Sequence, residues 1–410
     1  MRREPTGPSA RKPAECRRQG ARPARGAPLR PLLVLLAALL LGAGGLASAQ
    51  GQPDAGAAPP ALTSTAKLLA GVAPQDKDPA VLRIMASAAW RQHSKAAQYG
   101  DRRLQQRLGR MNQWQSQHLP HAAPGATLLY PFSGPDFINA YALFPDADTY
   151  VFFSLEPVGR IPPLGTMQEP ELAALFGDLR AALNDMVALN FFITPNMKEA
   201  LHTDALQGTT PLLLAMAGLL DLQVDEVAPF DPWPEMTRTY TAAHAAAPRP
   251  ALPETGVRIA FTNPRNGRHQ TLEYLSLDVS DHELKYYPGF LPWLRGFGHP
   301  TVLLKSASYL LHGSHFRQLR GELLADAGTI VQDDTGVPLR QLQQAGYQVS
   351  LFGQYERPVK LFEERYQPDL EEAFGKSGDK APLPFPFGYN WRKEGKSGLM
   401  LAQHPRSASD

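Results

Sequence analysis

Polar side chains that could bind or activate a small molecule follow four apolar runs of the sequence, at the point where each run ends. They are Ser133–Asp136 after the first run, Glu156 after the second, Lys305-Ser306 after the third and Asp333-Asp334 after the fourth. If the runs are parallel strands, their carboxyl ends meet at the edge of an open α/β sheet where ligands bind. The sequence therefore predicts one ligand-binding pocket, lined by Ser133, Gly134, Asp136, Glu156, Lys305, Ser306, Asp333 and Asp334.

Helix capping is a plainer interpretation of the same residues. Ser and Asp after a strand commonly accept hydrogen bonds from the first backbone N–H groups of the next helix. Asp136 stands three residues after Ser133, just before an apolar stretch, and has the position of such a cap. Both interpretations stay open at each of the four turns.

A serine hydrolase is a chemical alternative for this pocket. Such an enzyme needs a serine, a histidine and an acid, and Ser133 would be the serine, with His299, His312 or His315 as the source of a base. Ser133 stands in Phe-Ser-Gly-Pro, however, and lacks the Gly-x-Ser-x-Gly turn that holds a nucleophile on a strained elbow. Catalysis is left open, with Ser133, Asp136 and His312 as the candidate residues.

An acidic metal site would be another route to hydrolysis. Asp333-Asp334 could hold Ca²⁺ or Mg²⁺ with Asp136 or Glu156, but adjacent aspartates in an extended turn point apart. His312 and His315 would share a metal only on one helix, and Gly313-Ser314 indicates that a helix begins between them. We expect no metal site.

A Rossmann-type enzyme with a nucleotide cofactor is a further alternative. Gly134 lies in the first strand–helix turn, and Glu156 ends the next strand 22 residues later, where an acidic residue can bind a ribose hydroxyl. The turn has one glycine where the dinucleotide motif has three, and Pro135 lacks an N–H that could bind phosphate. We expect no cofactor.

Aromatic residues gather late in the chain, among many prolines. Such clusters are usually small cores under loops, although in exported proteins they also bind sugars or peptides. The residues concerned are Tyr286, Tyr287, Phe290, Trp293, Phe297, Phe385, Phe387, Tyr389 and Trp391.

The first 49 residues have the order of a cleavable signal peptide. The first 30 residues carry nine Lys or Arg and two Glu, an apolar run follows over 32–41, and Ala47-Ser48-Ala49 places small residues at −3 and −1. The apolar run is too short to span a bilayer as a stable helix. We expect cleavage after Ala49 and a soluble protein in the periplasm or outside the cell, with no membrane span after cleavage.

Removing this leader changes the charge of the protein. The whole chain has a formal charge of +2, the leader carries +7, and the remainder is therefore at −5. A mildly acidic protein is a poor ligand for nucleic acid, which we exclude as a partner. The only cysteine, Cys16, leaves with the leader, so the mature chain has no disulfide and no thiol nucleophile.

The remaining chain predicts a flexible linker over 50–61, a helical extension over 62–123, an α/β domain over 124–403 and a disordered tail over 404–410. Apolar residues at spacings of three and four indicate the helices of the extension. Alternating strands and helices with late antiparallel pieces predict a three-layer mixed α/β sheet with a Rossmann-like core. A Pro- and Ala-rich stretch over 242–254 is expected to be a surface linker.

Three local predictions are specific enough to check. Residues 257–262 and 271–279 should pair as a hairpin around Asn266-Gly267. Ser314 should cap a helix over 315–327. Residues 388–392 and 398–402 should form a last hairpin.

Several of these segments resemble an uncharacterised family of exported bacterial proteins, over residues 62–403. The resemblance implies export and assigns no activity, cofactor or catalytic residue. It depends on five segments: Tyr130–Asp136 (Y-P-F-S-G-P-D), Leu155–Gly159, Lys305–Leu310, Gln332–Pro338 (Q-D-D-T-G-V-P) and Tyr366–Leu370.

The sequence as a whole favours a periplasmic ligand-binding protein or cell-envelope accessory protein. Its partner would be a small molecule or an envelope component. An envelope hydrolase using Ser133 with a histidine, or an acidic metal site, is the alternative.

Overall fold

The computed structural model describes residues 61–119, 125–189, 201, 203, 205–233, 256–377, 382–390 and 396–405. All of these residues belong to one compact unit. The predicted leader (1–49) and surface linker (242–254) lie outside the described residues, as do nearly all of the linker (50–61) and most of the tail (404–410).

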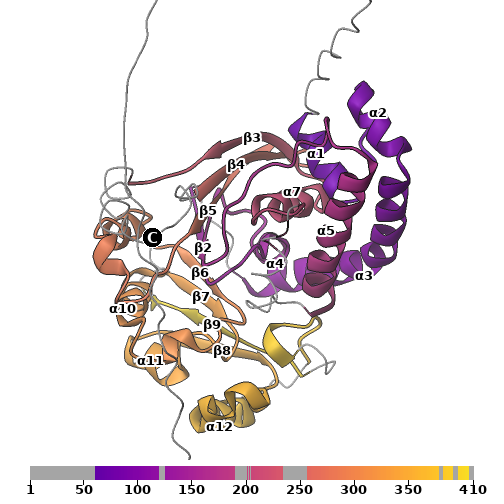
Figure 1. Ribbon diagram of the computed structural model, residues 1–410. Coiled ribbons are helices and arrows are strands. Elements are labelled where there is room, and N and C mark those ends of the chain that lie inside the picture. The colour runs from indigo at the N-terminus through magenta and orange to yellow at the C-terminus, as the bar shows by residue number, and fades with distance from the viewer. Residues whose placement is uncertain are drawn as a thin grey trace, which may run out of the picture. The chain divides into compact units, whose positions relative to one another are not determined.

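A mixed β-sheet forms the centre of the fold (Figure 1). In the described residues it has nine strands, in the order β3-β4-β5-β2-β1-β6-β7-β9-β8. The five consecutive strands from β5 to β7 are parallel to one another, and antiparallel strands extend both edges. The strands are β1 (Thr127–Pro131), β2 (Thr149–Ser154), β3 (Gln223–Pro229), β4 (Gly256–Asn263), β5 (Arg268–Ser276), β6 (Thr301–Leu304), β7 (Thr329–Gln332), β8 (Gln348–Gly353) and β9 (Gly398–Gln403).

Both faces of the central strands are buried. Along β1, Leu128 and Tyr130 join the core on one face and Leu129 joins the core on the other, as the two-residue period of a strand requires. Tyr150 and Val151 of β2 divide between the faces in the same way. Continuous apolar runs are therefore what these parallel strands need.

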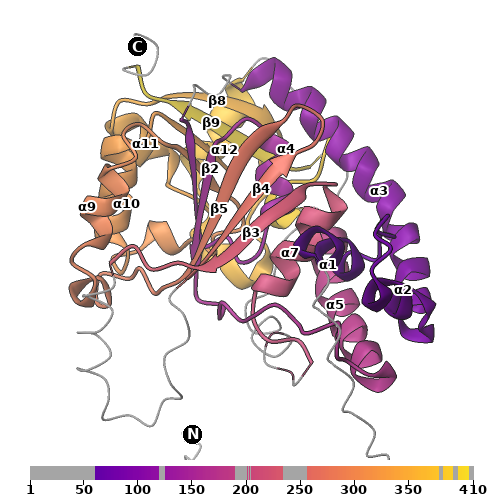
Figure 2. The same ribbon diagram turned by 90° about the horizontal axis from the view of Figure 1, so that it is seen from above.

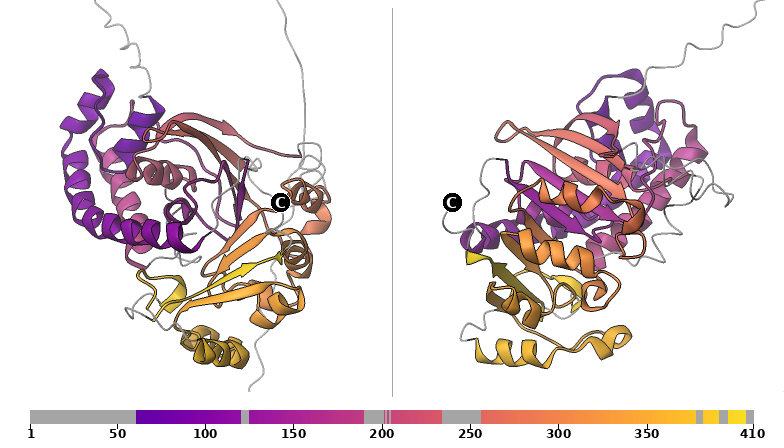
Figure 3. Two further views of the ribbon diagram at one scale, coloured as in Figure 1. Left: turned by 180° about the vertical axis from the view of Figure 1, so that it is seen from behind. Right: turned by 90° about the vertical axis from the view of Figure 1, so that its left-hand side faces the viewer.

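Helices cover the two faces of the sheet and make three layers (Figure 2). One face carries α1, α3, α4, α5 and α7, and the other carries α9, α10 and α11, which appear in orange on the opposite side in Figure 3. The helices are α1 (Leu62–Leu69), α2 (Pro79–Ala86), α3 (Ala88–His118), α4 (Phe137–Leu143), α5 (Glu169–Leu189), α7 (Thr210–Leu219), α9 (Phe290–Arg295), α10 (Arg317–Asp326), α11 (Leu339–Gln344) and α12 (Pro368–Lys376), with 3₁₀ turns η1 (Leu284–Tyr286), η2 (Leu310–His312), η3 (Lys360–Arg365) and η4 (Gly388–Asn390).

This arrangement confirms the predicted fold class, a mixed α/β sheet with a Rossmann-like core and an N-terminal helical region. The N-terminal helices pack directly into the core: α1 lies on α7 and α3 on α5. Side-chain caps begin two of them, because Asp78 accepts a hydrogen bond from Ala80 N and Ser87 accepts one from Trp90 N. No helix of the described residues has the length and apolar character needed to cross a membrane.

The predicted β4–β5 hairpin is confirmed, with Gly267 at φ +71° in its turn. Two other local predictions are wrong. The helix after Ser314 begins only at Arg317 and is not capped by Ser314. In its first turn the backbone N–H of Gln318 donates instead to the Oδ1 of Asp281 at 2.9 Å. Residues Gly388–Asn390 form a 3₁₀ turn, and β9 pairs instead with β7 and β8 (residues 391–395 lie outside the described residues). Strand partners far apart in the sequence gave no local signal for this pairing.

The late aromatic residues lie mostly in the cores. Phe290 is buried, and Tyr287, Trp293 and Phe297 pack against the same cluster, on the face that carries α9 and α10. Phe385 and Phe387 are buried on the opposite face. These residues thus belong to the two large cores on the faces of the sheet, not to separate small cores under loops.

His93 of α3 joins three of the helices on one face. Its Nε2–H donates to the carbonyl oxygen of Leu69 in α1 at 2.9 Å, and its ring stacks on Phe176 of α5 with centroids 4.6 Å apart. Burial lowers the pKa of His93 to about 4. The folded protein therefore holds this imidazole neutral.

Replacing His93 tests this packing through the pH dependence of stability. Between about pH 6.5 and pH 4 the unfolded chain binds a proton at this position and the folded chain does not, so acid lowers the free energy of unfolding. Between about pH 8 and about pH 5, the free energy of unfolding in urea should fall by about 2 kcal/mol less in His93→Phe than in the wild type. His282→Gln is the control, because that side chain is exposed. Equal losses in wild type and His93→Phe would contradict the assignment.

Candidate functional site

The order of the strands reverses direction between β1 and β6. From β1 the chain moves to β2 on one side, and after β5 it crosses to β6 on the other side of β1. In open α/β sheets the loops at the carboxyl ends of two such strands separate and leave a crevice, which is where ligands bind. The loops after β1 and β6 therefore flank the expected position of a site.

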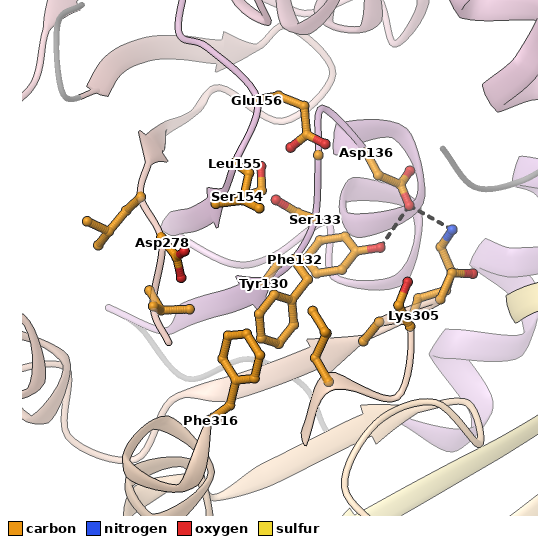
Figure 4. Close-up of a pocket in the computed structure, with 17 residues that line it drawn as sticks. Tyr130, Phe132, Ser133, Asp136, Ser154, Leu155, Glu156, Asp278, Lys305 and Phe316 are labelled. Carbon is orange, nitrogen blue, oxygen red and sulfur yellow. Dashed lines mark hydrogen bonds and ion pairs between the residues drawn. The ribbon is translucent and has the colours of Figure 1, made fainter. Parts of the chain in front are cut away.

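A pocket lies at this point (Figure 4), with an empty volume of about 750 Å³ counted out to its open mouth. Leu155 lines it and is half exposed, so one rim of the pocket faces solvent. Six of the eight residues predicted to bind a ligand line this pocket: Ser133, Gly134, Asp136, Glu156, Lys305 and Ser306.

Asp136 and Lys305 form a buried ion pair across the crevice. The Nζ of Lys305 lies 2.8 Å from the Oδ2 of Asp136, and both side chains are almost completely buried. Tyr130 donates its hydroxyl to the same Oδ2 at 2.9 Å. The other oxygen accepts hydrogen bonds from the side-chain amide and the backbone N–H of Asn139, so Asp136 also caps α4.

Arg107 adds a second cation near this carboxylate. It is a buried residue of α3, and burial lowers the pKa of its guanidinium to about 10, an effect that the charge of Asp136 opposes. The charges of Lys305 and Arg107 thus both compensate the charge of Asp136. The long N-terminal helix contributes to the site through this residue.

Glu156 has no such compensation. The residue is 4 % exposed, and its Oε2 is buried without a hydrogen-bond partner. In Figure 4 its carboxylate points into the pocket, on the side of Ser133. Among the described residues no lysine, arginine or histidine forms an ion pair with it. An uncompensated buried carboxylate is unfavourable for the empty protein.

A hydrogen-bond chain places Glu156 at the end of β2. The hydroxyl of Tyr274 in β5 donates to the carbonyl oxygen of Glu156 at 2.8 Å. Ser154 lies 2.9 Å from the same hydroxyl, and must be the donor to it because tyrosine has one proton. Ser154 therefore keeps lone pairs free to accept another hydrogen bond.

Two serine hydroxyls in the lining are also without partners. The Oγ atoms of Ser133 and Ser306 are buried and make no hydrogen bond within the described structure. Ser133 therefore has no base positioned on it, and none of the described residues lining this pocket is a histidine. The hydroxyls can donate to or accept from a bound molecule.

Strained backbone is concentrated in the two loops that flank the crevice. Five described residues other than glycine have a positive φ, and four of them are Phe132, Ser306, Ser308 and Tyr309, with φ between +50° and +58°. This conformation costs a residue with a side chain about 1–2 kcal/mol. Such strain is found where the surrounding contacts hold a functional geometry.

Asp333 and Asp334 do not line the pocket. Asp333 shapes the loop beside it, since its Oδ2 accepts the backbone N–H of Ser306 at 2.9 Å and its Oδ1 accepts the N–H of Thr335. Asp334 accepts the hydroxyl of Tyr309, and its pKa is raised because the carboxyl is buried and lies beside Asp333. These two residues line a smaller cavity of about 300 Å³ near β8 and β9.

The candidate histidines lie away from the pocket. His312 is half-buried at the end of η2, where burial lowers its pKa to about 4, and it packs edge-on against Tyr309. His299 and His315 are exposed, and no helix holds His312 and His315 together. Among the described residues no group of three or more His, Cys, Asp or Glu is placed to hold a metal ion.

Sequence reasoning missed Asp278 and the aromatic wall of the pocket. Asp278 follows β5, which is parallel to β2, so the rule that located Glu156 applies to it also. The sequence pattern indicates β5 only as the second strand of a hairpin, so it gives no sign that the carboxyl end of β5 reaches this edge. Phe132 and Phe316 form the wall, with ring centroids 5.4 Å apart and planes nearly perpendicular. Phe316 comes from the turn before α10, and nothing in the sequence links it to β1.

No protein-family model, curated protein or solved structure matches this chain. The interpretation of the site therefore depends on its own geometry.

Replacing Lys305 tests the central ion pair. Lys305→Met leaves the carboxylate of Asp136 buried beside an apolar side chain, and loss of one partner of such a pair costs about 3–5 kcal/mol. We expect this loss in urea unfolding at about pH 8. The deficit should shrink in acid, because protonation of Asp136 removes the buried negative charge that has lost its lysine partner.

Lys396→Met is the matched control. Lys396 pairs with Glu356 on the surface and is half exposed, so its removal should cost at most about 1 kcal/mol. Similar losses in the two variants would show that the buried pair contributes no more than a surface pair.

Proposed function

We propose that this chain is an exported protein that binds a small molecule in the pocket between the β1 and β6 loops. One observation carries the proposal: residues from turns more than 150 positions apart in the sequence, Ser133 and Lys305 among them, line a single pocket at the switch point of the sheet. Such a pocket is the usual ligand site of an open α/β fold.

The polar atoms of the pocket support binding. Buried polar groups in proteins are normally hydrogen-bonded, and each exception needs an explanation. Here the Oγ of Ser133, the Oε2 of Glu156 and the Oγ of Ser306 are all buried without partners around one cavity. A bound molecule with polar groups would satisfy them together.

The geometry favours binding of a small molecule over binding of a nucleotide cofactor. In the dinucleotide arrangement a phosphate lies at the N-terminus of the first helix. Here the carboxylate of Asp136 occupies the N-terminus of α4, and Pro135 supplies no N–H before it. A phosphate at that position would have to displace this carboxylate from the backbone N–H that it already binds.

The leader pattern supports a place in the periplasm or outside the cell. A ligand-binding protein there would capture a small molecule or a component of the cell envelope. The resemblance to exported bacterial proteins agrees with this place.

Expression in a bacterium with a cell envelope tests export. We expect the protein in the periplasmic or secreted fraction with Gln50 as its first residue, measured by intact mass and N-terminal sequencing. Ala49→Arg should block cleavage and leave the longer form, because signal peptidase needs a small residue at −1. Recovery of the uncleaved wild-type chain in the cytoplasm would contradict export.

Closing the mouth of the pocket tests binding. Thermal unfolding is measured with glucose, phenylacetate, 2-phenylethylamine and adenosine as probes. We expect at least one to raise the Tm, since a ligand at a hundredfold excess over its Kd stabilises the folded state by about 2.7 kcal/mol. Leu155→Trp should abolish the shift by filling the entrance.

Leu82→Trp is the matched control, because Leu82 lies on α2 and is 50 % exposed, against 51 % for Leu155. It should keep the shift. Absence of any shift in the wild type, or a shift that Leu155→Trp retains, would contradict binding in this pocket.

A further inference from the structure

The chemical class of the ligand follows from which hydrogen-bonding groups of the pocket are already used. The pocket is lined by three carboxylates, those of Asp136, Glu156 and Asp278, and by one ammonium group, that of Lys305. The contacts of each group show whether it remains available to a ligand.

Lys305, the charged hydrogen-bond donor in the lining of the pocket, already has a partner within the protein. Lys305 is ion-paired with Asp136 at 2.8 Å, and Tyr130 donates its hydroxyl to the same carboxylate. An anionic ligand would have to compete with a buried, fully hydrogen-bonded aspartate for these groups. A carboxylate or phosphate therefore fits the pocket poorly.

Hydrogen-bond acceptors in the lining of the pocket remain available to a ligand. The Oε2 of Glu156 has no partner although the residue is 96 % buried, and Ser154 donates its proton to Tyr274 and keeps its lone pairs. Asp278 adds a second carboxylate, half-buried, which accepts the backbone N–H of Ser280 through one oxygen. These acceptors thus favour a ligand that donates hydrogen bonds and carries a positive charge.

The opposite part of the pocket is apolar. Phe132 and Phe316 stand edge to face, as Figure 4 shows below the polar groups, and Leu277, Val279 and Leu310 complete the lining. The strained φ of Phe132 (+58°) belongs to the loop that presents this ring. A ring or a short alkyl chain can bury its surface there.

We propose that the ligand is an amine whose ammonium group binds the carboxylate of Glu156, with Ser133 and Ser154 as neighbouring acceptors, and whose apolar part lies against Phe132 and Phe316. The charge of such a ligand compensates Glu156, a buried carboxylate that pairs with no cation among the described residues. Charge-assisted hydrogen bonds of this kind are about twice as strong as neutral ones. This inference rests on the proposed function and specifies the ligand class of that same pocket.

Three probes with one phenyl ring and different polar groups test the inference. They are 2-phenylethylamine, 2-phenylethanol and phenylacetate, measured by titration calorimetry near neutral pH on the mature protein. We expect the amine to bind at least about tenfold more tightly than the alcohol, which corresponds to about 1.4 kcal/mol, and phenylacetate to bind most weakly.

Glu156→Gln removes the charge and keeps the shape of the side chain. It should weaken the amine by about tenfold or more and leave the alcohol nearly unchanged. Glu372→Gln is the control, because Glu372 is an exposed residue of α12 outside the pocket, and it should behave as the wild type.

The outcomes separate this inference from the proposed function. The alcohol binding as tightly as the amine, unchanged amine affinity in Glu156→Gln, or no binding of the amine would overturn the ligand class. Binding of glucose or adenosine that Leu155→Trp abolishes would still support the pocket. If Glu156→Gln does not fold, the order of the three probes on the wild type decides the question alone.

Discussion

The ion pair between Asp136 and Lys305 is the interaction on which the architecture of the site depends. It connects the loop after β1 with the loop after β6, where these neighbouring parallel strands send their chains to opposite sides of the sheet. A switch point separates two loops by topology. The ion pair ties them together at the base of the crevice, so the opening becomes a bounded pocket. Hydrogen bonds from Tyr130 and Asn139 and the positive charge of Arg107 make a buried carboxylate tolerable there.

The same ion pair sets the polarity of the pocket. Because Asp136 and Lys305 neutralise each other, the other polar groups that line the cavity decide which ligand charge it favours. Glu156 at the end of β2 is the chief of these, since nothing in the described structure pairs with its charge. A site with a cation at its centre would have been expected to bind anions. Internal pairing reverses this expectation, which a simple count of charged residues in the lining would not reveal.

The sequence could predict the central strands and six residues of the pocket because both follow from local patterns. A run such as Thr149–Ser154, apolar on both faces, indicates a buried parallel strand, and polar residues at its end must lie at the carboxyl edge. Which strands become neighbours is not a local property. Asp333 and Asp334 therefore lie at the predicted edge of the sheet but line another cavity. For the same reason, the predicted pairing of β9 with residues 388–392 is wrong. Phe316 reaches the pocket only through tertiary packing, which no periodicity records.

Preorganisation explains why the two loops hold left-handed residues. Ser306 and Tyr309 have strained backbones, yet Asp333 binds the N–H of Ser306 and Asp334 binds the hydroxyl of Tyr309. Asp333 and Asp334, which the sequence predicts to bind a ligand, thus hold in place the loop after β6, and other residues of this loop line the pocket. Each strained residue costs about 1–2 kcal/mol, and these hydrogen bonds to charged groups return a similar amount. The loop is fixed before any ligand arrives, so a ligand that fits loses little affinity in ordering the loop. The unpaired carboxylate of Glu156 is then the remaining unfavourable term of the empty site, and a cation removes it on binding.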